Sequence, residues 1–289
     1  MTAYAAPSLT IRGRRFDWGT RTYLMGVVNV SPESFSGDGL ADVAAAVAQA
    51  QRFAAEGADL IDVGGQSTRP GFAELGVEAE IERVVPAVAA IVAAVDLPVS
   101  IDAYRAPVVA AALDAGAHLV NDIWGFRHDP GVARLVADRG APAVVMHNQR
   151  GRLPAVEGEF HDVVADLHAG FEASLAIAAT AGVPRERLII DPGFGFGWTV
   201  EQNLEMLRRL GELRDLGLPI LVGTSRKSTL GAVLGLPEDE RIWGTAATVA
   251  IAIANGADIV RVHDVAQMAQ VCRMTDAVVR GSASEDRRA

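Results

Sequence analysis

The strongest constraint on the fold is a repeated alternation of short apolar runs with amphipathic helical stretches. The apolar runs cover Tyr23–Val28, Leu60–Val63, Pro98–Ile101, His118–Val120, Pro142–Met146, Leu188–Ile190, Pro219–Val222 and Asp258–Val262. Continuous apolar runs without alternation are typical of parallel strands covered on both faces. Eight strands that alternate with helices favour an α/β fold of the (β/α)8 TIM barrel type over an open doubly wound sheet.

The helical stretches and the chain length fit one such barrel. Helices are predicted at Leu40–Ala55, Gly76–Ala94, Ala106–Ala115, Pro130–Arg139, Val163–Ala181, Val200–Leu216, Lys227–Leu234, Trp243–Asn255 and Val265–Val279. A barrel of this type takes about 250 residues, and the chain has 289. We therefore predict a lead-in at residues 1–20, a single barrel at 21–280 and a charged tail at 281–289.

Charge and composition exclude several classes of partner. The net charge is −10 and no basic run occurs, which argues against nucleic acid and against an anionic membrane surface. No uniformly apolar run reaches the roughly 20 residues that span a bilayer. The N-terminus lacks the pattern of a secretory signal, and a single cysteine, Cys272, fits a reducing compartment. We expect a cytoplasmic protein.

A polar residue ends every predicted strand. In chain order these residues are Asn29, Asp62, Asp102, Asn121 with Asp122, His147, Asp191, Ser225, and Arg261 with His263. Any one of them could simply cap a turn. Because the carboxyl ends of barrel strands converge, all of them together predict an active site at that end.

Four glycine-rich loops follow these strand ends. They cover Asn29–Gly39, Gly64–Gly71, Asp191–Gly197 and Gly223–Ser228. Glycines let backbone amides approach a ligand, and a helix N-terminus behind such a loop favours an anion. The glycines of the third loop are not a dinucleotide fingerprint, because they lack its strand-to-helix spacing.

Together these segments carry a family resemblance. The stretches MGVVNVSPESFS, IDVGGQSTRPG, NDIWG, DPGFGFG, LVGTSRKS and RVHD, in this order, resemble the dihydropteroate synthase family over roughly Leu24 to Ala277. The resemblance implies a (β/α)8 barrel that joins p-aminobenzoate to 6-hydroxymethyl-7,8-dihydropterin pyrophosphate and releases pyrophosphate with the help of Mg²⁺. Members of the family are usually homodimers and are inhibited by sulfonamides.

The resemblance also implies a role for individual residues. The pterin pocket would be formed by Asp62, Asp102, Asn121, Met146, Asp191 and Lys227, and the p-aminobenzoate pocket by Thr68, Arg69, Pro70, Phe196, Lys227 and Ser228. Gly195 and Gly223, in the loops after the sixth and seventh strands, would also bind the substrates. Asn29 would bind Mg²⁺, while Arg261 and His263 would bind the pyrophosphate. We expect Asp102, Lys227, Arg261 and His263 to carry the catalysis, by orientation and leaving-group electrostatics rather than by a nucleophile.

Some positions depart from the family pattern. Gln66 stands where glutamate is usual, Ala103 where threonine or serine is usual, and Trp198 where lysine is common. Two other readings stay open: the pterin-binding barrel of a corrinoid-dependent methyltransferase, and a paralogue that binds pterin without turnover. For a homodimer, the predicted contact surface is formed by the helices Ile242–Ala254 and Val265–Val279, and the alternative is that their alanine and valine faces pack only on the barrel.

Overall fold

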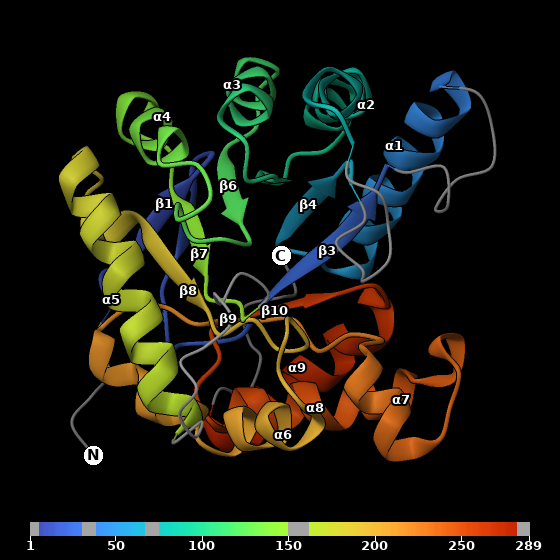
Figure 1. Ribbon diagram of the computed structural model, residues 1–289. Coiled ribbons are helices and arrows are strands. Elements are labelled where there is room, and N and C mark those ends of the chain that lie inside the picture. The colour runs from blue at the N-terminus through green and yellow to red at the C-terminus, as the bar shows by residue number, and fades with distance from the viewer. Residues whose placement is uncertain (1–5, 31–38, 67–74, 150–161, 282–289) are drawn as a thin grey trace.

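The computed structural model describes residues 6–30, 39–66, 75–149 and 162–281. Its centre is a parallel barrel with a strand at every predicted position (Figure 1). The barrel strands are β3 (Tyr23–Asn29), β4 (Leu60–Gly64), β5 (Val99–Asp102), β6 (Leu119–Asp122), β7 (Ala143–Met146), β8 (Leu188–Asp191), β9 (Leu221–Val222) and β10 (Ile259–Val262). The predicted fold class is confirmed.

Helices form a ring around the strands (Figure 1). They are α1 (Gly39–Glu56), α2 (Val77–Ala94), α3 (Ala106–Asp114), α4 (Gly131–Arg139), α5 (Val163–Ala181), α6 (Val200–Arg208), α7 (Ser228–Leu234), α8 (Ile242–Ala254) and α9 (Val265–Val279). Short 3-10 segments lie at η1 (Arg185–Arg187), η2 (Leu210–Leu216) and η3 (Glu238–Glu240). The helix predicted at Val200–Leu216 is therefore α6 followed by η2, with the α-helical backbone ending at Arg208.

The strands pair in the order β8-β7-β6-β5-β4-β3-β10-β9. The remaining seam, between β8 and β9, is closed by an isolated bridge between Ile190 and Ile220 and by a hydrogen bond from Ile190 N to Pro219 O of 2.9 Å. Pro219 precedes β9 and has no N–H to donate, which helps to explain why this strand has only two residues. The barrel is consequently weakest at this seam.

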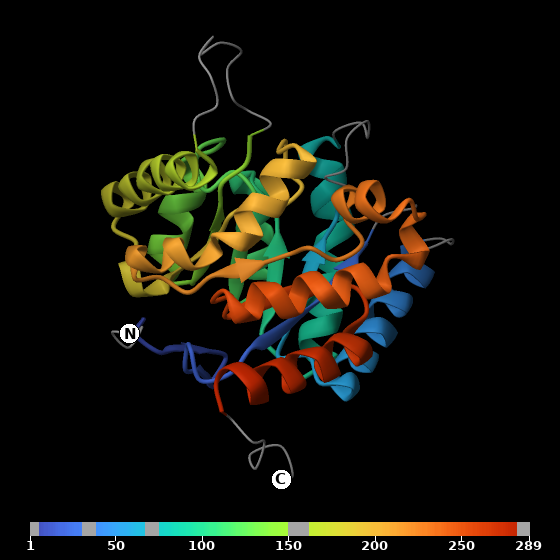
Figure 2. The same ribbon diagram turned by 90° about the horizontal axis from the view of Figure 1, so that it is seen from below.

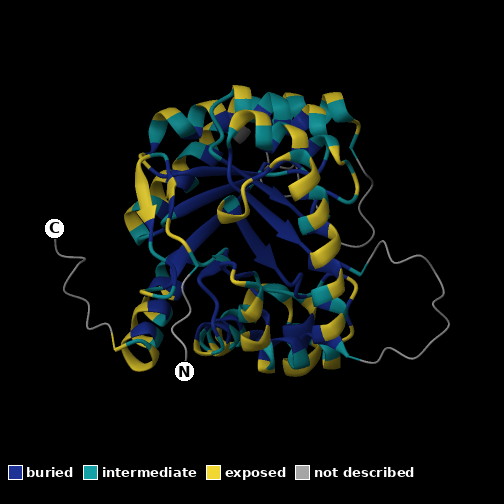
Figure 3. Ribbon diagram, turned by 90° about the vertical axis from the view of Figure 1, so that its left-hand side faces the viewer, coloured by how far each residue is buried: buried dark blue, intermediate teal, exposed yellow. Residues whose placement is uncertain are grey.

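The core has two layers. The outer layer packs the helices onto the strands, and Figure 3 shows the barrel strands buried and the outer faces of the helices exposed. The inner layer fills one end of the barrel with alternate strand residues, among them Met25, Leu60 and Leu119. All three are fully buried, so this end of the barrel is closed.

An N-terminal hairpin completes the closed end. Strands β1 (Leu9–Ile11) and β2 (Arg14–Phe16) pair antiparallel within the segment predicted as a lead-in. Leu9, Ile11 and Phe16 pack into the inner layer, and Figure 2 shows the hairpin at one end of the barrel. The opposite end, where the strands finish, is left for a site.

One helix has the dimensions of a membrane span. By length and composition α5 is apolar enough to cross a bilayer, unlike the expectation from the sequence. In the fold its buried residues, including Val164, Leu167 and Phe171, belong to the outer core layer. It therefore occupies the place of an ordinary barrel helix.

Candidate active site

A charged cluster lies at the carboxyl ends of β4, β5, β6 and β10. Arg261 donates from Nε to Asp62 Oδ2 at 2.6 Å and from Nη2 to Asp102 Oδ2 at 2.8 Å. Asn121 Nδ2 donates to the same Asp62 oxygen at 3.0 Å. The structure thus brings together four residues predicted for the site, although up to 199 positions separate them in the chain.

Asp62 keeps one oxygen for another partner. Its side chain is fully buried, and Oδ1 has no hydrogen-bond partner among the described residues. A buried polar atom without a partner is costly, so such atoms often mark a place where a ligand or water binds. This oxygen is available to accept a hydrogen bond at the mouth of the barrel.

Asp191 and Lys227 extend the cluster across the seam. Asp191 ends β8 and accepts a hydrogen bond from Gly193 N at 2.7 Å. Lys227 Nζ donates to Phe194 O at 2.6 Å and lies 3.9 Å from the centre of the Phe196 ring. The lysine therefore joins the loop after β9 to the loop after β8.

Burial and charge compete in this cluster. Burial raises the pKa of Asp102 to about 7, although Arg261 opposes the rise. Burial likewise raises the pKa of Asp191 to about 6, against the hydrogen bond from Gly193 and the charge of Lys227. Burial alone would lower the pKa of Arg261, but Asp62 and Asp102 raise it above its usual value. Shifts of this kind are common at functional sites.

An apolar wall stands beside the charges. Met146 and Phe196, both predicted, pack with Tyr104 and Ile123, and the partly buried Trp124 joins them. The last three were missed, although each follows a predicted strand-end residue by two or three positions. A flat ring can pack on such a wall while its edge reaches the carboxylates.

His263 is held by the loop after β9. Its Nδ1 lies 3.0 Å from Ser225 Oγ, and its backbone N donates to the same oxygen at 3.2 Å. Arg226, with a left-handed backbone at φ 58°, pairs with Asp264 next to His263. The end of β10 is thus fixed against the loop that carries Lys227.

Of the two predicted glycines, Gly195 has a steric reason and Gly223 has none. Gly195 has a φ of 80°, and a Cβ there would lie 2.7 Å from Lys227 Cδ. At Gly223 a Cβ would lie 3.7 Å from Arg261 Cβ, which is ordinary contact. Ser228 is exposed as the first residue of α7.

Three predicted residues lie outside the described part of the chain, namely Thr68, Arg69 and Pro70. Gln66, just before them, donates to Tyr104 Oη at 3.4 Å and accepts from Arg105 Nη2 at 3.2 Å. Trp198, another departure from the family pattern, is buried in the outer core layer beside the His147 ring. Ala103 is buried as well.

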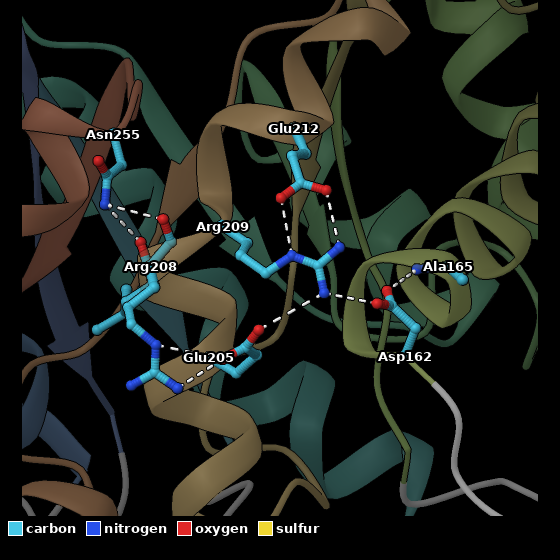
Figure 4. Close-up of polar contacts among 8 residues, drawn as sticks. Asp162, Ala165, Glu205, Arg208, Arg209, Glu212 and Asn255 are labelled. Carbon is cyan, nitrogen blue, oxygen red and sulfur yellow. Dashed lines mark hydrogen bonds and ion pairs between the residues drawn. The ribbon is translucent and has the colours of Figure 1, made fainter.

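A separate polar network lies on the outer helices (Figure 4). Arg209 contacts Glu205, Glu212 and Asp162, with Nη1 2.5 Å from Asp162 Oδ2. Asp162 also caps α5 by accepting from Ala165 N at 2.8 Å. The surface hollow beside this network contains no strand-end residue, so we assign it a structural role.

Comparisons with known proteins place the chain in a class. The family of pterin binding enzymes matches residues 25–263, and the chain belongs to it. Fold and site thus define a pterin-binding barrel.

Individual relatives narrow the class. A dihydropteroate synthase from Synechocystis is 44% identical over 97% of this chain and 98% of its own. The crystal structure of a dihydropteroate synthase from Clostridium difficile in the presence of pteroic acid has a TM-score of 0.87 and 44% identity, and covers 92% of this chain and 99% of that one. The structure of a Xanthomonas albilineans dihydropteroate synthase with 4-aminobenzoic acid has a TM-score of 0.87 and 40% identity, and it covers 95% of this chain and 98% of that one.

Proposed function

We propose that this chain is a dihydropteroate synthase. It transfers the pterin methylene of 6-hydroxymethyl-7,8-dihydropterin pyrophosphate to the amino group of p-aminobenzoate, giving 7,8-dihydropteroate and pyrophosphate. The observation that carries the proposal is the cluster of Asp62, Asp102, Asn121 and Arg261 beside an apolar wall. Two relatives that align with this chain over nearly their whole length are named dihydropteroate synthase.

The pterin would lie with its ring on the wall and its polar edge toward the charges. Carboxylates accept from ring N–H and amino groups, while Asn121 and Lys227 donate to ring oxygen and nitrogen. Oδ1 of Asp62, which has no hydrogen-bond partner in the described part of the chain, is one such acceptor. Asp102 and Asp191 become better acceptors when ionised, which the ligand's donors would favour.

Pyrophosphate departs toward positive charge. Arg261 and His263 are the groups at the end of β10 that would bind it, and Arg261 would then share its donors between the carboxylates and the leaving group. Positive groups aimed at charge that develops in the transition state act by electrostatic stabilisation. The bond to pyrophosphate breaks first, so the electron-rich dihydropterin ring carries the cationic methylene until the arylamine attacks.

Magnesium would assist at the same place. No group of three His, Cys, Asp or Glu side chains suited to a metal occurs in the described residues. Asn29, however, directs its Oδ1 to within 3.6 Å of where a Cβ on Gly64 would lie, at the mouth of the barrel. One hard oxygen of this kind suits Mg²⁺, which keeps several waters and binds mainly through substrate phosphates. Bound there, the ion would neutralise pyrophosphate charge.

A coupled assay tests the function. Purified chain, both substrates and Mg²⁺ should release pyrophosphate and form dihydropteroate, and a sulfonamide should compete with p-aminobenzoate. Failure to form dihydropteroate from the two substrates would contradict the proposal. Transfer of a methyl group from methyltetrahydrofolate to a corrinoid would support the methyltransferase alternative, and pterin binding without turnover would indicate a paralogue.

We also propose a cytoplasmic homodimer. Every exposed large apolar side chain of the described residues lies on α7, α8 or α9, and they are Val233, Leu234, Trp243, Ile251, Met274, Val278 and Val279. Exposed apolar patches of this kind mark protein contacts. Sedimentation should give a dimer, and Trp243→Asp, at a residue 80% exposed, should give a monomer that remains folded.

A further inference from the structure

The segment His147–Gln149, directly after β7, makes bonds that the proposed chemistry does not use. It lies between the loops after β6 and β8 on one side and α5 on the other. The backbone N of His147 donates to Asp191 O at 3.0 Å, and that of Gln149 donates to Phe196 O at 3.0 Å. The Asn148 side chain donates to Ile123 O. Each bond ends on or beside a residue of the site.

Glycines allow this close fit. A Cβ on Gly193 would lie 2.0 Å from His147 O, and one on Gly125 would lie 2.9 Å from Met146 O. On the helix side, a Cβ on Gly170 would lie 1.9 Å from His147 Nδ1. The backbones that follow β6, β7 and β8 therefore pack closely against one another at the carboxyl end of β7.

The imidazole of His147 fixes this end of β7 to α5. It is buried, and Nε2 lies 2.9 Å from Asp166 Oδ2. Because a carboxylate only accepts, Nε2 is the donor in this contact. Nδ1 is buried and has no hydrogen-bond partner among the described residues, so the ring is held from one side by Asp166 and from the other by contact with Gly170.

We infer that His147 and Asp166 are a positioning pair for the substrate wall. Met146 precedes His147 directly, and the bonds of the segment reach Ile123 and Phe196. A shift of His147 would therefore move the surface on which the substrate rings pack, while leaving the strand-end charges on their own strands. The pair does not touch the reacting atoms, and its effect is on substrate binding.

The test separates positioning from stability, and it rests on the proposed function. His147→Leu removes the donor, Asp166→Asn weakens its acceptor, and Gly170→Ala displaces the ring without removing any polar group. Each should raise KM for both substrates by about tenfold, the equivalent of one charged hydrogen bond, with kcat nearly unchanged. His147→Gln, which can still donate to Asp166, should restore most of the loss.

Asp162→Ala is the matched control. It removes the cap of the same helix α5 and lowers its stability without touching His147. KM values that stay at the wild-type level in His147→Leu, or that rise equally in Asp162→Ala, would overturn the inference. If His147→Leu does not fold, Asp166→Asn and Gly170→Ala decide by the same criterion.

The failure of the proposed function would look different. The wild-type chain would then release no pyrophosphate, and none of the variants would be informative through turnover. Calorimetric binding of 6-hydroxymethyl-7,8-dihydropterin to the same variants would still decide the positioning role, since affinity should fall about tenfold in His147→Leu and not in Asp162→Ala.

Discussion

The two ends of the barrel use the same residue types in opposite ways. At the closed end, Asp59 accepts from Arg21 and from Leu24 N, and Asp276 accepts from the N and Oγ1 of Thr22. At the open end, Asp62 leaves a buried oxygen without a partner among the described residues, and burial raises the pKa of Asp102. Satisfied carboxylates stabilise a fold, whereas unsatisfied ones are available to a ligand.

The largest expected effect comes from exchanging an arginine for alanine at each end. Arg261→Ala should lower kcat by about 100- to 1000-fold, as for the loss of one group that stabilises transition-state charge. It should lower binding of free hydroxymethyl dihydropterin far less. Arg21→Ala should lower the melting temperature and leave kcat unchanged. Steady-state kinetics with calorimetry measures both, and equal losses of turnover and pterin binding in Arg261→Ala would assign this residue to the pterin alone.

His263→Ala should act in the same direction as Arg261→Ala but less strongly, because its ring is already engaged by Ser225. A loss of about tenfold or more in kcat, with pterin affinity retained, would support the role in pyrophosphate release. Ser225→Ala is the companion variant, since it removes the Ser225 hydroxyl from the ring and leaves the imidazole in place. Unchanged turnover in both variants would remove His263 from the catalytic residues.

The same isosteric change sharpens the contrast at two aspartates. Asp102→Asn should weaken pterin binding by about 1.5 to 3 kcal/mol, because a charged acceptor is lost, while the fold is retained. Asp276→Asn should instead lower the free energy of unfolding by about 1 to 3 kcal/mol and leave kinetics intact, because buried donors lose their acceptor. Titration calorimetry should show the affinity loss only in Asp102→Asn, and denaturant unfolding should show the stability loss only in Asp276→Asn. A stability loss without an affinity loss in Asp102→Asn would contradict the site.

The smallest effect is a dependence on pH. Burial raises the pKa of Asp102 to about 7, and the ionised form is the better acceptor for a pterin. A proton must therefore leave before the ligand binds, so affinity should fall as pH decreases below 7, by at most about tenfold per pH unit for one proton. Asp102→Asn should flatten this profile and Asp276→Asn should not. Burial raises the pKa of Asp191 to about 6, so protonation of this residue should lower the affinity further below pH 6.

Much of this site could be predicted because parallel strands place their carboxyl ends together. The positions of Asp62, Asp102, Asn121 and Arg261 within or directly after an apolar run predict each of them without knowledge of any contact. The contacts themselves were not predictable, since the ion pair of Arg261 with Asp62 depends on side-chain directions across the barrel.

Two other features were missed for different reasons. The hairpin of β1 and β2 has strands of only three residues, too short for a periodic pattern. The cue in the sequence is Gly13, because glycine readily adopts the positive φ of 73° that this turn requires. The end of α6 at Arg208 was missed because apolar residues continue at Leu210 and Leu213, which the 3-10 segment also buries.

The weak seam between β8 and β9 has a consequence for the ligand-bound protein. Asp191 stands on one side of the seam and Lys227 follows the other, so a ligand held by both spans the gap where backbone hydrogen bonds are fewest. The bound pterin would link β8 to β9 where the two strands share few backbone hydrogen bonds. In the free protein we expect the amide protons of β8 and β9 to exchange with solvent faster than those of β4 and β5. Binding of the pterin should reduce this difference.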